Sequence, residues 1–311
     1  MGGMDDREIE LGFENQRARI GVWGASLRGY DCDGVEIAWG YHGKASKKGG
    51  QGDVLAPWPG RVENGYYEFE GIQFQLEKTD KDGPNAIHGF VRNQLWRVIT
   101  ESPASVELGF ELPASHYANR GYDFSLELKV RYELSAQGLK CSFEMKNVGV
   151  RPAPVGIGFH PYFTLGAATA NQLELFLPSS QSIEFKNLIP TGRVLPTAGS
   201  EVDFSTLRKV GAVEINHCLM TLKRDSDGLA RARIRNPENG LEMALWMDQA
   251  FDYIVVYTGD AIPAPGSRRA LAVEPMTCGT DAFNRPEWGL KTLKPGDSFR
   301  GSFGFQLNRS P

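Results

Sequence analysis

The sequence lacks the features of a membrane, secreted or nucleic-acid-binding protein. No apolar run is long enough to span a bilayer, and the opening residues, MGGMDDREIE, contain no apolar segment of the kind that secretory signals carry. The formal net charge of -4 gives no basic surface for nucleic acid. These absences predict a cytoplasmic protein whose partners include neither membranes nor nucleic acids.

Motifs for disulfides and metals are also absent. The four cysteines are scattered without a C-x-x-C pair, so we expect reduced thiols packed as small apolar groups. The five histidines lie far apart and form no H-E-x-x-H motif, so no metal site is expected. These residues are Cys32, Cys141, Cys218, Cys278, His42, His88, His116, His160 and His217.

Helical periodicity is scarce, and the dominant pattern has a period of two residues. Apolar side chains occupy every second position of residues 122–134, and residues 139–145 repeat the pattern after the turn SAQG. Residues 65–78 and 230–247 show the same alternation on either side of glycine-containing turns. Only residues 203–211 are expected to form a short helix, capped by Asp203 or Ser205.

This pattern predicts an all-β fold. Many strands without crossover helices indicate large antiparallel sheets stacked as a sandwich. Because no linker divides the chain, we expect one domain over residues 1–311, with about residues 1–12 as a flexible N-terminal extension.

Four stretches carry polar residues that a sandwich does not require. Arg61 follows the stiff segment PWPG, and its planar fork of donors suits adjacent sugar hydroxyls or a carboxylate. His88 lies in NAIHGF, just before a strand-like segment. Taken alone, each residue also fits an ordinary role, as a surface arginine and as a structural hydrogen-bonding group.

The other two stretches are GIGFHPYFTL and LAVEPMTC. Gly156 and Gly158 allow close approach of a backbone or ligand before His160, and Pro161 ends the strand after it. Glu274 follows an apolar strand, where desolvation tends to raise a carboxyl pKa and so makes a general base near neutrality. A solvated glutamate at a strand end is the alternative.

Five stretches together resemble, in order and spacing, the motifs of the aldose 1-epimerase (galactose mutarotase) family, in its broad bacterial branch. They are PWPGRVENGYYEFEG, NAIHGFVR, PVGIGFHPYFTL, FDYIVVYTG and VEPMTCGTDAFN. The resemblance runs from about Trp23 to Leu307. It implies a large antiparallel β-supersandwich, galactose mutarotase-like, that interconverts the anomers of a free hexose such as glucose or galactose.

The resemblance also implies roles for the four polar stretches. Glu274 matches the general base, which takes the anomeric hydroxyl proton, and His160 matches the general acid, which protonates the ring oxygen. His88 matches a second histidine near that oxygen, and Arg61 matches the arginine that grips sugar hydroxyls. One base and one acid around a single carbon suffice for ring opening, so no cofactor is expected and the partner is a small-molecule sugar.

One position departs from the family pattern. Many relatives carry an acidic residue where this chain has Asn216, which hydrogen-bonds hydroxyls without a charge. Asp252 is a candidate substitute for binding substrate. The departure affects the expected hydroxyl preference more than the chemistry.

Two alternatives stay open from the sequence, as does the oligomeric state. A hexose-6-phosphate 1-epimerase needs further cations, for which Arg92, Arg268 and Arg269 are candidates, although GSRRA also fits a solvated loop. A non-catalytic sugar-binding or sensing protein on the same scaffold is the other. The lysines of KASKKGG are expected in an exposed, flexible loop.

Overall fold

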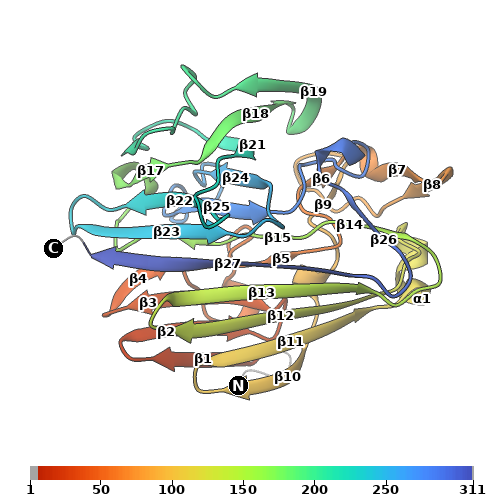
Figure 1. Ribbon diagram of the computed structural model, residues 1–311, viewed down its shortest axis with the longest axis horizontal. Helices are drawn as coiled ribbons and strands as arrows, with labels where there is room; N and C mark the ends of the chain where they lie inside the picture. Colours follow the sequence, from red (N-terminus) through yellow and green to blue (C-terminus); the bar gives the residue numbers. More distant parts are fainter. Residues whose placement is uncertain (1–5, 310–311) are drawn as a thin grey trace.

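The computed structural model describes residues 6–309 and contains two large antiparallel sheets (Figure 1). The larger, 12-stranded sheet contains β1 (Glu8–Phe13), β2 (Gln16–Gly21), β3 (Ser26–Cys32), β4 (Val35–Ala38), β16 (Tyr162–Phe163), β25 (Leu271–Met276), β24 (Tyr253–Tyr257), β21 (Asn216–Leu222), β18 (Ser179–Lys186) and β19 (Ile189–Pro196) in this order, with β5 (Val54–Leu55) and β15 (Gly158–Phe159) beside them.

The smaller, 9-stranded sheet lies over the larger one. Its strands, in order, are β10 (Arg97–Ser102), β11 (Ser105–Leu112), β12 (Leu126–Ser135), β13 (Gly138–Asn147), β27 (Ser298–Arg309), β23 (Leu241–Met247), β22 (Ala230–Arg235), β17 (Glu174–Phe176) and β20 (Arg208–Lys209). The all-β fold expected from the alternating sequence pattern is therefore confirmed.

Three two-stranded sheets and a few short helical turns complete the structure. The strand pairs are β14 (Ala153–Val155) with β26 (Lys291–Leu293), β6 (Arg61–Val62) with β9 (Ala86–Ile87), and β7 (Tyr66–Phe69) with β8 (Ile72–Gln75). The helical turns are α1 (Ala114–Tyr117), η2 (Lys44–Ser46), η3 (Glu63–Gly65), η4 (Val91–Asn93), η5 (Ala118–Arg120), η6 (Ala170–Gln172) and η7 (Pro286–Trp288).

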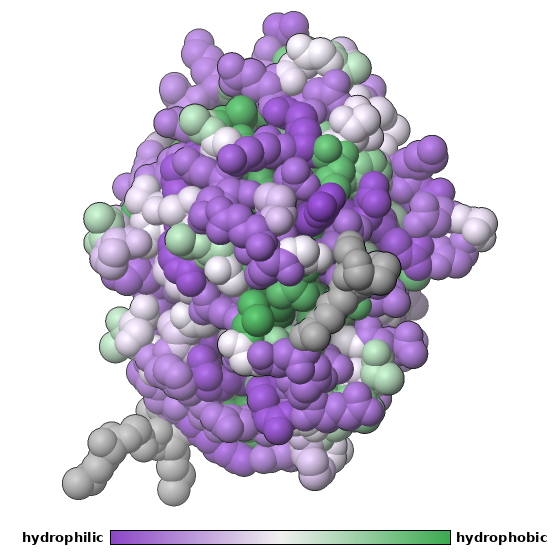
Figure 2. Space-filling model, turned by 90° about the vertical axis from the view of Figure 1, so that its left-hand side faces the viewer, coloured by the Kyte–Doolittle hydropathy of each residue, from purple (hydrophilic) through white to green (hydrophobic). Residues whose placement is uncertain are grey.

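The main core lies between the two large sheets. Along β12 every second side chain is buried, and β12 pairs with β13 over ten residues, as the period-two pattern predicts. Aromatic rings from the two sheets contact each other in this core. The ring centroid of Phe305 lies 6.1 Å from that of Tyr30 and 5.0 Å from that of Phe163. The surface in Figure 2 is mostly hydrophilic, with small and separate hydrophobic patches. The apolar surface is thus removed from water mainly between the sheets.

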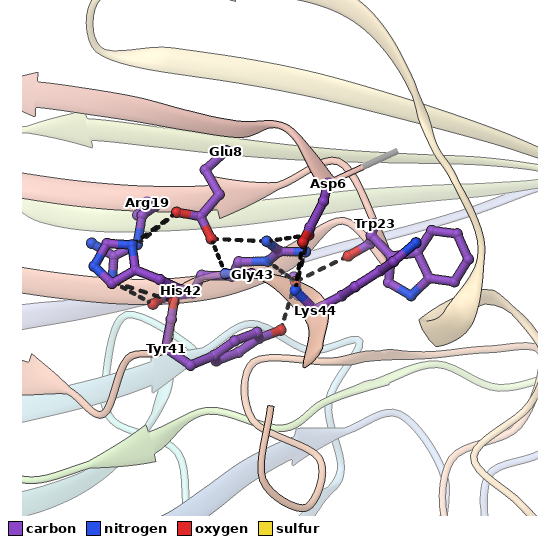
Figure 3. A network of polar contacts seen from close by, with 10 residues as sticks. Asp6, Glu8, Arg19, Trp23, Tyr41, His42, Gly43 and Lys44 are labelled. Carbon is purple, nitrogen blue, oxygen red and sulfur yellow. Dashed lines mark hydrogen bonds and ion pairs between the residues drawn. The ribbon is translucent and has the colours of Figure 1, made fainter. Parts of the chain in front are cut away.

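The beginning of the described chain is held in the fold. Residues 8–13 form β1, which pairs with β2 over six residues, and Glu8 accepts a hydrogen bond from the buried Arg28 guanidinium at 2.8 Å. Figure 3 shows Asp6 and Glu8 facing the loop that carries Tyr41, His42, Gly43 and Lys44. The predicted flexible extension is therefore wrong for residues 8–12, because strand pairing and ion pairs fix them; residues 1–5 lie outside the described part of the chain.

The short helix expected at residues 203–211 does not form. Asp203 uses its carboxylate instead in a turn, where it accepts hydrogen bonds from the backbone N–H groups of Gly199 and Ser205 at 3.0 and 3.2 Å. Local bonding of this kind competes with helix formation. The segment continues into β20, on the edge of the smaller sheet.

Candidate active site

Glu274 lies on the face of the larger sheet that points away from the main core. All six residues of β25 are buried, and Leu271 and Val273 belong to the core between the sheets. Because side chains alternate along a strand, Glu274 projects to the opposite face, where it is only 1% exposed. Two smaller apolar clusters occupy this face, one containing Tyr253 and Met276 and the other Tyr162 and Ala272. The carboxyl group is therefore largely removed from water although it lies outside the main core.

His160 faces Glu274 from the connection between β15 and β16. Its Nε2 lies 3.3 Å from Oε1 of Glu274, and its ring stacks on Tyr162 with centroids 4.9 Å apart and planes at 17°. The backbone N–H of His160 donates to Asp53 O at 3.0 Å, and Gly52 N–H donates to His160 O at 2.9 Å. Backbone bonds and ring stacking thus fix the imidazole edge that meets the carboxyl group.

His88 completes a group of three titratable side chains. Its ring centroid lies 5.8 Å from that of His160 at 79° between planes, and its backbone has a left-handed φ of 62°. The backbone N–H of Gly60 donates to Nδ1 of His88 at 3.1 Å. With Nδ1 acting as acceptor, the neutral ring carries its proton on Nε2 and can donate it. His88 is therefore both a structural hydrogen-bonding group and a potential donor near Glu274 and His160.

Burial determines the protonation of this group. It raises the pKa of Glu274 well above its usual value, and it lowers the pKa of His160 to about 3, with the Arg92 charge acting in the same direction. The pKa of His88 is lowered well below its usual value by burial and by the charges of Arg92 and Arg61. Because Glu274 and His160 lie 3.3 Å apart, their titrations are coupled, and burial favours the uncharged form of the pair, in which Glu274 is protonated and His160 is neutral.

Arg61 is oriented by two aspartates. Its Nε donates to Asp80 Oδ2 at 2.7 Å, and its Nη2 lies 3.5 Å from Asp82 Oδ2. The Asp80 side chain is almost completely buried, and hydrogen bonds from Arg61 and Asn85 lower its pKa although burial opposes this. Arg61 also stands close enough to His88 for its charge to lower the pKa of that histidine.

The structure separates the two other predicted substrate-binding residues. Asn216 begins β21 opposite Tyr257, on the same face of the sheet as Glu274 but two strands away and exposed. Asp252 precedes β24, and its exposed carboxylate pairs with Arg224 at 3.0 Å. Asn216 thus shares the sheet face of Glu274, whereas the Asp252 carboxylate pairs with Arg224.

Of the three cations considered for an anionic substrate, only Arg92 lies at this site. Arg268 bonds Asp260, Asn171 and backbone carbonyl groups, and Arg269 bonds Glu36 and the Ala167 carbonyl. Arg92 lies 3.7 Å from the buried Asp53 carboxylate.

Sequence reasoning missed Lys47 and Asp53. Lys47 Nζ donates to both Asp53 oxygens, at 2.9 and 3.2 Å, and its side chain is only 15% exposed. The expectation of an exposed, flexible loop is therefore wrong for Lys47. One signal was present in the sequence, because Asp53 directly precedes the apolar run VLAPW, as a buried carboxylate at a strand start would.

The comparisons with known proteins agree with this fold. The aldose 1-epimerase family model matches residues 7–306, so the chain belongs to the aldose 1-epimerase family. The uncharacterized protein YihR of Escherichia coli K12 is 29% identical over 277 residues, which are 89% of this chain and 85% of that protein. The maltose epimerase of Levilactobacillus brevis is 26% identical over 80% of this chain and 77% of its own length.

The fold is shared with solved structures of the same family. The GalM/aldose epimerase homologue of C. elegans superposes with a TM-score of 0.88 at 18% identity, covering 98% of this chain and all of the other. Its likeness confirms the galactose mutarotase-like architecture. Within residues 6–309, no helix has the length and apolarity needed to cross a bilayer, and no three His, Cys, Asp or Glu side chains gather as metal ligands would.

Proposed function

We propose that the protein is an aldose 1-epimerase, which interconverts the α and β anomers of a free hexose such as glucose or galactose by acid–base ring opening and reclosure. The observation that carries the proposal is the 3.3 Å contact between Glu274 Oε1 and His160 Nε2, with His88 beside it. Family membership supports an isomerase. The relative from Levilactobacillus brevis is named as a maltose epimerase.

Ring opening requires two proton transfers around one carbon. Glu274 takes the proton of the anomeric hydroxyl O1 while the C1–O1 double bond forms. The bond from C1 to the ring oxygen O5 breaks, and His160 gives O5 a proton. Rotation about C1–C2 turns the other face of the carbonyl toward O5, and both transfers then run backwards to yield the other anomer. Each positioned proton transfer is typically worth about 10²–10⁴-fold in rate.

The cycle starts from the charged form of the pair, with Glu274 as a carboxylate and His160 protonated, which the 3.3 Å contact stabilises. Once the ring has opened, Glu274 is protonated and His160 is neutral, which is the uncharged form that burial favours. The protein state of the open-chain intermediate is thereby stabilised, and reclosure returns the proton to His160. The neutral His88 donates from Nε2 to the oxygen on which charge develops, and Arg61 binds sugar hydroxyls.

Exchange NMR on α- and β-glucose and on the galactose anomers tests the proposal. The wild-type protein should accelerate anomer exchange, and Glu274→Gln should lower the rate about 10²–10⁴-fold because Gln cannot accept the proton. Glu68→Gln, at an exposed residue of β7, is the matched control and should keep the wild-type rate. Folded wild-type protein that leaves every anomer at its buffer rate refutes catalysis; if it also binds sugar tightly, the non-catalytic alternative holds.

A second candidate substrate class has an observation in its favour. Lys47 and Arg92 bring two positive charges to the site, and Asp53 balances one of them. The remaining charge favours an anionic sugar such as a hexose 6-phosphate. Exchange rates on glucose and glucose 6-phosphate decide between the classes, and a preference for the phosphate that Arg92→Gln abolishes would replace the free hexose as substrate.

A further inference from the structure

Asp53 is a buried carboxylate that the proposed acid–base chemistry does not use. Its side chain is 0% exposed, and it lies immediately before β5. Both of its oxygens accept hydrogen bonds from Lys47 Nζ, and Arg92 Nη1 approaches one of them to 3.7 Å. A charge so deeply buried is costly unless it is paired. Because this buried charge lies next to His160, we expect a role for Asp53 in the site.

The segment that carries Asp53 holds His160 in place. The Asp53 carbonyl and the Gly52 N–H group bind both backbone polar groups of His160, at 3.0 and 2.9 Å. The backbone at Gly50 also lies against the imidazole, since a Cβ added there would stand 2.6 Å from His160 Cδ2. A shift of residues 50–53 would move the ring that faces Glu274.

The same carboxylate reaches the segment that carries His88. Arg92 belongs to η4, four residues after His88, and Lys47 Nζ donates to Asn93 Oδ1 at 3.3 Å as well as to Asp53. Lys47, Asp53 and Arg92 thus form one junction between two loops that are distant in sequence. The junction connects the supports of both histidines.

We propose that Asp53 is the positioning residue of this site, which fixes His160 and His88 relative to Glu274 and offsets the positive charge of Lys47 and Arg92 beside them. The inference rests on the proposed acid–base function of the histidines. Asp53 itself acts through its neighbours and does not touch the sugar.

The charge role has a definite sign. The titratable and charged groups around the two histidines are Glu274, Tyr162, Lys47, Arg92, Asp53 and Arg61. Burial raises the pKa of Asp53, and the Lys47 and Arg92 charges oppose this rise. The two hydrogen bonds from Lys47 Nζ favour the carboxylate form of Asp53. Without this negative charge, the excess positive charge favours the carboxylate form of Glu274 and the neutral form of His160.

Asp53→Asn keeps the size and an acceptor oxygen but removes the charge. We expect kcat for anomer exchange to fall about 100-fold with a far smaller change in KM, because misplacement of reacting groups acts on the transition state. The acidic limb of the kcat/KM profile should move to lower pH. Asp53→Asn with Lys47→Met restores the local charge and should return the limb toward its wild-type position. Glu8→Gln, which also removes a carboxylate from a buried arginine pair, is the control and should leave the limb unmoved.

Two further measurements keep the outcomes distinct. Lys47→Met alone should move the limb to higher pH, which tests the charge role even if Asp53→Asn does not fold. The ¹³C resonance of the Glu274 carboxyl should titrate at lower pH in Asp53→Asn than in wild type, and this readout requires no activity. An Asp53→Asn protein with kcat/KM within threefold of wild type, or with unmoved limb and carboxyl titration, overturns the inference. If the wild-type protein does not accelerate anomer exchange, but the Glu274 carboxyl still titrates at lower pH in Asp53→Asn than in wild type, the proposed function is refuted and the charge role of Asp53 is kept.

Discussion

The burial of the Glu274 carboxyl lowers the stability of the protein near neutral pH. Burial raises its folded-state pKa above the unfolded value near 4.5. As the pH rises past that unfolded value, the unfolded chain ionises this group while the folded chain does not. Stability is therefore lost between the unfolded and the folded pKa, and none is lost from this group below pH 4.5.

Glu274→Gln should consequently stabilise the protein at pH 7.5, although it lowers the rate of anomer exchange. The gain should be about 1–3 kcal/mol, because each pH unit above the unfolded pKa and below the folded pKa costs the wild type about 1.4 kcal/mol, and it should vanish at pH 4. Calorimetric Tm values at both pH values measure it, with Glu68→Gln as the exposed control. A Tm that falls at pH 7.5 would mean that the ionised carboxylate stabilises the fold.

The sequence alone predicted single residues of the site, but it did not predict the charged residues Lys47 and Asp53 that surround them. Glu274 and His160 stand out because they interrupt apolar strands, and the structure places them 3.3 Å apart. Lys47 and Asp53 look like ordinary charges near a glycine-rich loop, since nothing local indicates that the loop folds back onto His160. Asp252 was chosen from its position beside a motif, whereas its ion pair with Arg224 depends on tertiary structure.

At the scale of elements, local pattern predicted hairpins and not the order of strands. The β7–β8, β12–β13 and β22–β23 pairs were all expected, because alternation and turn residues are read within one short segment. The pairing of β25 with β16, which brings Glu274 to His160, joins residues more than 100 positions apart, such as Tyr162 and Ala272. Such pairings depend on the whole core and leave no signal in either strand.

Gly158 allows β15, the strand just before His160, to pack closely against its neighbours. Close approach was expected there, and the neighbours are protein atoms, because an added Cβ would lie 2.1 Å from Met276 Sδ and 2.9 Å from Pro59 Cβ. Gly158→Ala should destabilise the protein by about 1–3 kcal/mol, as overpacking commonly does. Urea unfolding measures the change. Gly12→Ala, whose nearest neighbour is a flexible arginine end at 3.4 Å, should change stability far less; equal effects would contradict the packing argument.

At the scale of the whole molecule, side chains of the two large sheets contact each other directly. Tyr132, on β12 of the smaller sheet, donates its hydroxyl to the Ala25 carbonyl between β2 and β3 at 2.9 Å. The Tyr30 and Phe163 rings of the larger sheet meet Phe305 of the smaller one. Residues from both sheets form one continuous core. We therefore predict that the chain folds as a single domain.

A single domain should unfold in one transition. Urea unfolding followed by far-UV circular dichroism, near-UV circular dichroism and tryptophan fluorescence should give coincident curves. Tyr132→Phe removes the hydroxyl that links the sheets and leaves the Ala25 carbonyl unpaired, so it should cost about 1–3 kcal/mol. The midpoint should move equally in all three probes, because loss of a contact between the sheets weakens both at once. Separate transitions, or a shift confined to one probe, would instead mean that each sheet holds its own cooperative unit.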